Sequence, residues 1–472
     1  MSSIGPASDL ADSPTVSFGQ ALRFWLWLGC MSFGGPAAQI ALMHEALVVR
    51  RRWISEKRFL HALHYCMLLP GPEAQQLATY TGWLMHGTRG GIVAGALFVL
   101  PSLLILILLS WAYTVWGHHP WGQALLWGLK PAVTALVLHS AHRLALRTLK
   151  ERWLWGVAGL SLLGMLWGLP FPLIIAAAAA AGFFMARPHI TPPLPERVDH
   201  EPQCANPSAQ DRPDRAWLDD NTPAPAHTHF SRPRLVRALV LGWALWGLSL
   251  GLIALLFGVG HTLTQMGGFF TQAALLTFGG AYAVLPFVTQ AAVGHYNWLT
   301  AAQMMDGLAL GESTPGPLIM VVAFVGFLGG HSQALFGHPF LGGIVAACVA
   351  TWFTFLPSFV FILAGGPLVE STRHMPSLAG PLQGIMAAVV GVILHLAGVF
   401  AHQSCFPNGW HQMPDLAAMA LTVLAAWLLI KKQLSVFKLL GLCTALGLGW
   451  QLLVYVAAPT PAPSHFLGYR SG

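Results

Sequence analysis

The stretch Ser32-Phe-Gly-Gly35 returns 245 residues later as Thr277-Phe-Gly-Gly280. Two further motifs repeat at the same offset: Trp53-Ile-Ser55 with Trp298-Leu-Thr300, and Pro70-Gly-Pro72 with Pro315-Gly-Pro317. Three matches at one offset, without a gap, indicate that a structural unit has been duplicated within the chain.

Charged residues are scarce around these repeats. Of 472 residues, 9% are charged and 55% are apolar, and the mean hydropathy is +0.61. Soluble globular chains carry about 25% charged residues, so the composition excludes an ordinary soluble enzyme and predicts an all-α polytopic membrane protein in a lipid bilayer. The net charge of +7 comes from basic clusters beside apolar runs. Such clusters mark cytoplasmic loops, and no nucleic-acid partner is expected.

Composition divides the chain into six parts. They are an N-terminal tail (1–17), a first repeat (18–186), a disordered Pro-rich linker (187–234), an extra segment (235–267), a second repeat (268–458) and a C-terminal tail (459–472). The repeats contain about 10–13 apolar membrane segments, of which the 58–86 stretch fits best as a re-entrant hairpin.

Basic residues indicate how the repeats are oriented. In the first repeat they follow the first and fourth apolar segments, at Arg50–Arg52 and at Arg143 and Arg147. The equivalent loops of the second repeat have no Lys or Arg, and basic residues stand instead at Lys431 and Lys432. By the positive-inside rule the two repeats have inverted topologies, as in many secondary transporters.

Gly and Pro interrupt an apolar run twice in each repeat. The interruptions contain the candidate substrate-binding residues: Ser32, Gly34, Gly35, Pro36, Pro70, Gly71, Pro72, Thr277, Gly279, Gly280, Ser313, Thr314, Pro315, Gly316 and Pro317. Proline suits the first turn of a helix, so each interruption is expected to end one half-helix and begin another. A helix start inside a membrane leaves N–H groups that favour an anion, and nearby hydroxyls would add donors. The alternative is that the breaks only kink spanning helices.

Isolated charges near these breaks are candidates for coupling and for an anion path. The coupling candidates are the carboxylates Glu73, Glu312, Asp306 and Glu45, and the path candidates are Arg23 and Lys130. A protonated carboxyl tolerates a nearby dianion, whereas an ionised one repels it. The alternative for Glu73 is a first-turn acid that satisfies a helix dipole, and the alternative for Arg23 is snorkelling to the interface.

Motifs for other chemistries are missing from the sequence. It contains no P-loop, no His-Glu-x-x-His and no haem motif, and its six cysteines form no close pair. No cofactor and no metal site is therefore expected.

Together the motifs resemble the two-domain chromate ion transporter family of bacteria. The resemblance rests on Phe33-Gly-Gly-Pro36, Leu69-Pro-Gly-Pro-Glu-Ala74 with Gln76-Leu-Ala78, Thr277-Phe-Gly-Gly-Ala-Tyr282 and Gly311-Glu-Ser-Thr-Pro-Gly-Pro317. The second repeat departs from the first at Ala281, which stands where Pro36 does, and at Leu318, which stands where Glu73 does. The two halves are therefore not expected to contribute equivalent residues to one site.

This resemblance implies a secondary transporter, not an enzyme, that exports chromate across the bacterial inner membrane and confers chromate resistance. The driving force would be the membrane potential, a proton gradient or both. Sulfate has the same shape and charge, so a permease for sulfate or another oxyanion is the alternative, and a membrane-embedded redox enzyme acting on chromate is a remote one. The number of subunits is left open, a homodimer included.

Overall fold

The structure is a computed structural model that describes residues 16–117, 119–185, 216–218, 227–228, 230–371, 379–406 and 413–457. Within these ranges the chain is helical, and its single β contact is a parallel bridge between Ile54 and Leu218. The predicted all-α fold is confirmed.

The first half of the chain contains seven α-helices and one π-helical turn. They are α1 (Phe18–Met31), α2 (Gly35–His44), the π-helical η1 (Glu45–Arg50), α3 (Glu56–Leu68), α4 (Glu73–Trp116), α5 (Pro120–Thr148), α6 (Arg152–Leu166) and α7 (Phe171–Met185). Helix α8 (Arg232–Phe257) follows the linker.

The second half begins at α9 and continues to the C-terminal helix. Its elements are α9 (Thr262–Leu275), α10 (Ala281–Thr289), the π-helical η3 (Gln290–His295), α11 (Ala301–Ser313), the 3₁₀ turns η4 (Leu318–Met320) and η5 (Leu335–Gly337), α12 (Val321–Ser332), α13 (Pro339–Ser371), α14 (Ala379–Cys405), α15 (Leu416–Lys432) and α16 (Val436–Ala457).

The repeated motifs correspond to repeated elements. The two π-helical turns, η1 and η3, lie at the motif offset of 245 residues, and so do α3 and α11. Even a local strain recurs, because Arg52 and Asn297 both have a φ of 53°. Helix α9 begins at Thr262, a few residues before the predicted start of the second repeat at 268, since the His261 side chain accepts from the Leu263 N–H there.

Helix α4 consists of two arms that fold back on each other. The backbone leaves the helical region at His86 and Gly87, and a Cβ placed on Gly90 would lie 2.3 Å from the carbonyl oxygen of Gly82. Eight residues of a continuous helix would separate these positions by about 12 Å. The second half has the same hairpin, formed by α12 and α13, where a Cβ on Gly330 would lie 2.3 Å from the Gly342 carbonyl oxygen.

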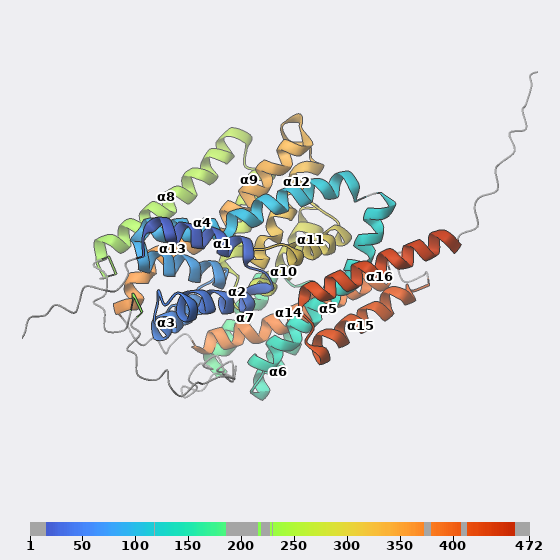
Figure 1. Ribbon diagram of the computed structural model, residues 1–472, viewed down its shortest axis with the longest axis horizontal. Helices are drawn as coiled ribbons and strands as arrows, with labels where there is room; N and C mark the ends of the chain where they lie inside the picture. The colour runs from blue at the N-terminus through green and yellow to red at the C-terminus, as the bar shows by residue number, and fades with distance from the viewer. Residues whose placement is uncertain are drawn as a thin grey trace, which may run out of the picture.

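The two halves interlock through their long helices. Helix α14 packs against α5, α6 and α7 of the first half, and α5 packs in turn against α15 and α16 of the second half. Helices α1, α4, α9 and α13 form a second group of packed helices. Figure 1 shows the two groups side by side, with α2, α10 and α11 near the middle of the molecule.

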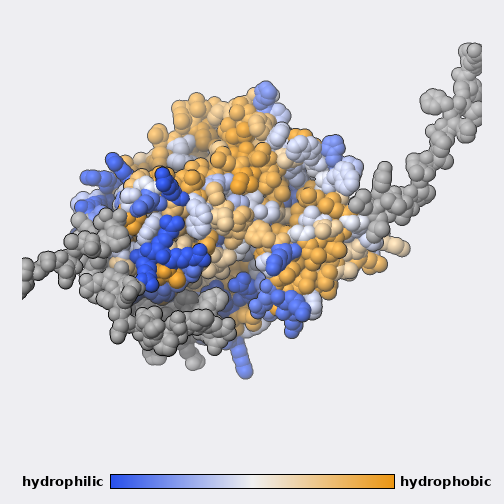
Figure 2. Space-filling model, in the orientation of Figure 1, coloured by the Kyte–Doolittle hydropathy of each residue, from blue (hydrophilic) through white to orange (hydrophobic). Residues whose placement is uncertain are grey.

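The outer surface is largely apolar. Figure 2 shows apolar side chains over most of the visible face, with hydrophilic ones gathered in patches. Five described helices (α4, α5, α8, α13 and α14) are long and apolar enough to cross a membrane. Leu255 on α8 is 84% exposed and Phe184 on α7 is 82% exposed, which lipid contact explains and water contact does not. The chain is therefore a polytopic membrane protein.

Most of the predicted linker, 187–234, and most of both tails, 1–17 and 459–472, lie outside the described residues. The described part of the linker contacts the first repeat. Residues Trp217 and Leu218 donate backbone hydrogen bonds of 3.1 Å to the carbonyl oxygens of Arg52 and Trp53. The six-part division, the number of crossings and the opposite orientation of the repeats stay predictions.

Candidate functional site

Each of the four Gly/Pro interruptions ends one helix and begins another. Helix α2 begins after Gly34, α4 after Pro72, α10 after Gly280 and η4 after Pro317. None of these four starts has a side-chain cap. Their first N–H groups are therefore left to another partner, as the Pro and Gly pattern predicts.

The interruptions of one half are hydrogen-bonded to those of the other. The Gly71 N–H donates to the carbonyl oxygen of Thr277 at 2.7 Å, and the Gly316 N–H donates to that of Ser32 at 2.6 Å. Donors and acceptors occupy equivalent positions in the two repeats, so the pair of bonds is related by a pseudo-two-fold axis. We call residues 32–36, 70–72, 277–280 and 314–317 the crossed junction.

Two helix starts meet at the crossed junction. A Cβ placed on Gly280 before α10 would lie 4.0 Å from Cγ of Pro36 in the first turn of α2. The positive ends of two helix dipoles therefore converge from different halves of the chain. In a low-dielectric membrane, such convergence is costly unless an anion or water compensates it.

Close packing surrounds the glycines of the crossed junction. Gly71 and Gly316 have φ values of 126° and 105°, a region that favours glycine. A Cβ on Gly71 would lie 2.4 Å from Ser358 Oγ, and one on Gly316 would lie 2.5 Å from Ser102 Cβ. Ser102 and Ser358 are themselves equivalent, since both follow a Leu-Pro pair.

The candidate hydroxyl donors behave differently from one another. Thr277, Thr314 and Ser313 donate to carbonyl oxygens of their own helices, at 2.6, 3.0 and 2.9 Å. The Ser32 hydroxyl is buried without a partner. Of these four hydroxyl groups, only that of Ser32 is therefore unpaired in this conformation.

Glu312 lies beside the crossed junction on α11. It is 6% exposed, and its Oε1 accepts a hydrogen bond from the Tyr282 hydroxyl of α10. The Ser140 hydroxyl of α5 is within hydrogen-bonding reach of Tyr282, and Arg143 lies within electrostatic range of it. A carboxyl, a phenol and a guanidinium from three helices thus gather at one edge of the junction.

Glu73 lies beside the junction as the first residue of α4. Its carboxyl is within electrostatic range of Arg147, which lies one turn after Arg143 on α5. The two coupling candidates next to a break, Glu73 and Glu312, therefore each have an arginine of α5 nearby: Arg147 beside Glu73, and Arg143 beside Tyr282, the partner of Glu312.

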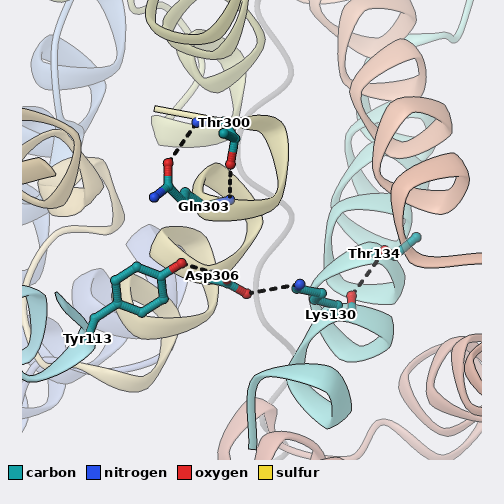
Figure 3. A network of polar contacts seen from close by, with 6 residues as sticks. All are labelled: Tyr113, Lys130, Thr134, Thr300, Gln303 and Asp306. Carbon is teal, nitrogen blue, oxygen red and sulfur yellow. Dashed lines mark hydrogen bonds and ion pairs between the residues drawn. The ribbon is translucent and has the colours of Figure 1, made fainter. Parts of the chain in front are cut away.

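Lys130 and Asp306, predicted for separate roles, form one ion pair. The Lys130 Nζ is 3.8 Å from Asp306 Oδ1, and the Tyr113 hydroxyl donates to Asp306 Oδ2 at 3.0 Å. Figure 3 shows Asp306 of α11 between Tyr113 of α4 and Lys130 of α5. Asp306 is 3% exposed, and a buried carboxylate needs a compensating charge. The ammonium group of Lys130, from the other half of the chain, provides it.

Two other candidates lie on the surface. Glu45 pairs with Arg50 through an exposed 2.9 Å contact, and Arg23 is exposed on α1. Among the described residues, no three His, Cys, Asp or Glu side chains gather as a metal site requires.

Several residues of the site are not among the sequence candidates. Gln39 and Gln76, whose Nε2 atoms donate to the carbonyl oxygens of Gly316 and Pro70 at 2.6 and 2.7 Å, are polar residues within one turn after a break, and so is Tyr282. That position is the signal that could have found them. Arg143 and Arg147 were interpreted only as loop markers. Their i, i+4 spacing, which puts both on one face of α5, was the available sign of a shared role.

The chain matches the family model described as Chromate transporter over residues 19–183 and 264–449. It belongs to the chromate transporter family. The two matched stretches contain all four interruptions and leave out the linker and α8, so the family pattern coincides with the duplicated helices. The predicted resemblance is confirmed.

Three full-length relatives extend this family match. The chain is 28% identical to a probable chromate transport protein of Synechococcus elongatus (89% of this chain, 92% of that protein). It is 28% identical to a chromate transport protein of Cupriavidus metallidurans (91% and 92%) and 31% identical to one of Pseudomonas aeruginosa (90% and 96%). No solved structure matches the chain.

Proposed function

We propose that this protein is a secondary transporter that exports chromate across the bacterial cytoplasmic membrane. The crossed junction carries the proposal. It brings two uncapped helix starts together from different halves of the chain, beside the unpaired Ser32 hydroxyl. Converging helix N-termini at the centre of two repeats suit a compact anion, and the named relatives are chromate transport proteins.

The arginines of α5 supply an entry to this centre. Arg143 and Arg147 are exposed and lie near Tyr282 and Glu73 respectively. By the positive-inside rule this end of α5 faces the cytoplasm. An anion attracted there would meet Glu73 and Glu312 on its way to the junction, and protonation of these carboxylates would then govern its entry.

The energetics favour outward movement. An anion gains about 2.3 kcal/mol per charge for each 100 mV of potential, so a dianion gains roughly 4.6 kcal/mol and a singly protonated oxyanion about half of that. An inside-negative potential therefore drives chromate out without ATP, in accord with a sequence that contains no P-loop.

The test is transport by everted membrane vesicles that contain the protein. A lumen-positive potential should drive labelled chromate into the vesicles, and an uncoupler should abolish this accumulation. Vesicles without the protein are the control. The absence of potential-dependent accumulation would refute export, and excess sulfate that competes as well as unlabelled chromate would indicate a general oxyanion permease.

A further inference from the structure

Two buried glutamine side chains at the crossed junction each leave their amide oxygen without a donor. Gln39 of α2 is fully buried. Its Nε2 donates to the carbonyl oxygen of Gly316 at 2.6 Å and to that of Ser32 at 3.4 Å. Because a carbonyl oxygen only accepts, these contacts fix the orientation of the amide. The Oε1 atom is therefore an acceptor, and it has no partner.

Gln76 of α4 repeats this arrangement at the other half of the junction. Its Nε2 donates to the Pro70 carbonyl oxygen at 2.7 Å and lies 3.5 Å from Ser358 Oγ. Its Oε1 is likewise buried and unpaired. Both acceptors come from the first repeat, because the equivalent positions of the second hold Val284 and Val321.

The crossed junction therefore contains unpaired donors as well as unpaired acceptors. The donors are the uncapped N–H groups at the starts of α2 and α10 and the Ser32 hydroxyl. The acceptors are the Oε1 atoms of Gln39 and Gln76. A buried acceptor left without a proton costs about 1–3 kcal/mol, so a ligand or water that brings a proton should occupy this place.

Resting on the proposed function, we propose that the crossed junction binds the oxyanion in a singly protonated form, with its one O–H shared between the amide oxygens of Gln39 and Gln76. Such an anion offers three oxygens to the helix starts and one proton to this pair of acceptors. A fully deprotonated anion would point a lone pair at these amide oxygens. Sites that hydrogen-bond a ligand hydroxyl discriminate strongly against analogues that lack it.

This arrangement selects among tetrahedral oxyanions by basicity. Chromate takes up its first proton near neutral pH, whereas sulfate and selenate do so only in strong acid. The three anions share shape and charge, so helix dipoles and arginines alone do not separate them. Gln39 and Gln76 are thus the residues that would distinguish chromate from sulfate.

Several titratable or charged groups surround the glutamines. They are Glu73 of α4, Glu312 of α11, Tyr282 of α10, and Arg143 and Arg147 of α5. Their protonation changes transport of every oxyanion alike. The informative quantity is therefore the ratio of chromate to selenate transport at each pH, because both anions meet the same protein charges.

The experiment measures this ratio with purified protein in liposomes. The wild-type ratio should fall about tenfold per pH unit above the pH at which hydrogen chromate loses its proton. Gln39→Met and Gln76→Met remove the acceptor at similar volume. Each should lower the ratio on the acidic side by about tenfold to a hundredfold. Gln272→Met, whose side chain is exposed on α9, should keep the wild-type ratio.

Two outcomes overturn the inference and leave the proposed function intact. One is a wild-type chromate-to-selenate ratio that does not change with pH. The other is a pair of transport-competent Met variants that retain the wild-type ratio, which would mean that the amide oxygens hold only water. If the Met variants do not fold, the wild-type pH series still decides. A protein that moves no chromate at any pH contradicts the proposed function itself.

Discussion

At the scale of single residues, Glu73 and Glu312 differ in their surroundings although both flank a Pro-Gly-Pro motif. Glu312 is held by the hydroxyl of Tyr282, whereas Glu73 begins a helix near Arg147. The second repeat has Leu318 where Glu73 stands, and the first has Met67 where Glu312 stands. The backbone of the crossed junction is pseudo-symmetric, but the carboxylates beside it stand at non-equivalent positions in the two halves. Glu73 and Glu312 therefore need not act at the same step of transport.

Replacement of Glu312 by Gln should remove the part of the pH dependence of transport that chromate and selenate share. A carboxyl that must gain or lose a proton makes the rate change about tenfold per pH unit on one limb, and a glutamine cannot titrate. The measurement is transport of both anions in vesicles over a range of pH, normalised to the amount of protein. Glu45→Gln, at an exposed ion pair, is the control and should keep the wild-type profile. A Glu312→Gln profile that matches the wild type would remove Glu312 from coupling.

Replacement of Gly316 by Ala should destabilise the protein by about 2–5 kcal/mol. The positive φ costs an alanine roughly 1–2 kcal/mol, and the new Cβ would overlap Ser102 at a further cost of about 1–3 kcal/mol. Thermal unfolding in detergent measures the change, and Ser102→Gly in the same chain should recover part of it. Gly247→Ala, with no heavy atom within 4 Å of its Cβ position on α8, should be neutral or stabilising. Equal stability of Gly316→Ala and wild type would show that the junction is loosely packed.

At the scale of elements, α5 connects the two halves. It carries Lys130, which pairs with Asp306 of α11, and Ser140 and Arg143, which face Tyr282 of α10. The Lys130–Asp306 pair holds α5 beside α11, whose C-terminal end leads into the crossed junction. A movement of α5 relative to α11 would therefore change both the ion pair and the surroundings of Glu312.

The ion pair between Lys130 and Asp306 should show strong coupling in a double-mutant cycle. Lys130→Met leaves a buried carboxylate uncompensated, which costs about 3–5 kcal/mol. The double variant Lys130→Met with Asp306→Asn should be more stable than Lys130→Met alone, because no charge is left behind. Thermal unfolding of the four proteins gives the interaction energy. Additive effects of the two substitutions would mean that the 3.8 Å contact contributes nothing.

The sequence predicted elements better than it predicted contacts. The breaks at residues 32–36 and 314–317 were predictable because Gly and Pro act locally on the backbone. The crossing of these breaks was not, because a single sequence does not record which distant segments pair. Lys130 and Asp306 were assigned to different roles for the same reason. From the sequence, Arg143 and Arg147 indicate only topology, since the positive-inside rule considers only the loop beside a charge.

At the scale of the whole molecule, the two halves are not stacked side by side but interlocked. Helix α14 lies against α5, α6 and α7, and α5 lies against α15 and α16, so neither half has a complete packing surface alone. The crossed junction lies between halves joined in this way. Any rocking of one half against the other, as the proposed function requires, would therefore strain the bonds from Gly71 to Thr277 and from Gly316 to Ser32 together.

Opposite orientation of the halves is testable by thiol labelling at equivalent positions. In a chain without its native cysteines, Val49→Cys and Gly294→Cys introduce exposed thiols within the two π-helical turns, at the repeat offset. Val49 precedes the basic run Arg50–Arg52, so its thiol should react with an impermeant reagent only in everted vesicles, as should Lys150→Cys. Gly294→Cys should react only in intact cells or spheroplasts. If Gly294→Cys reacts from the same side as Lys150→Cys, the repeats are parallel. The pseudo-two-fold axis through the crossed junction would then run along the membrane normal, and rocking about the junction would not exchange its two faces.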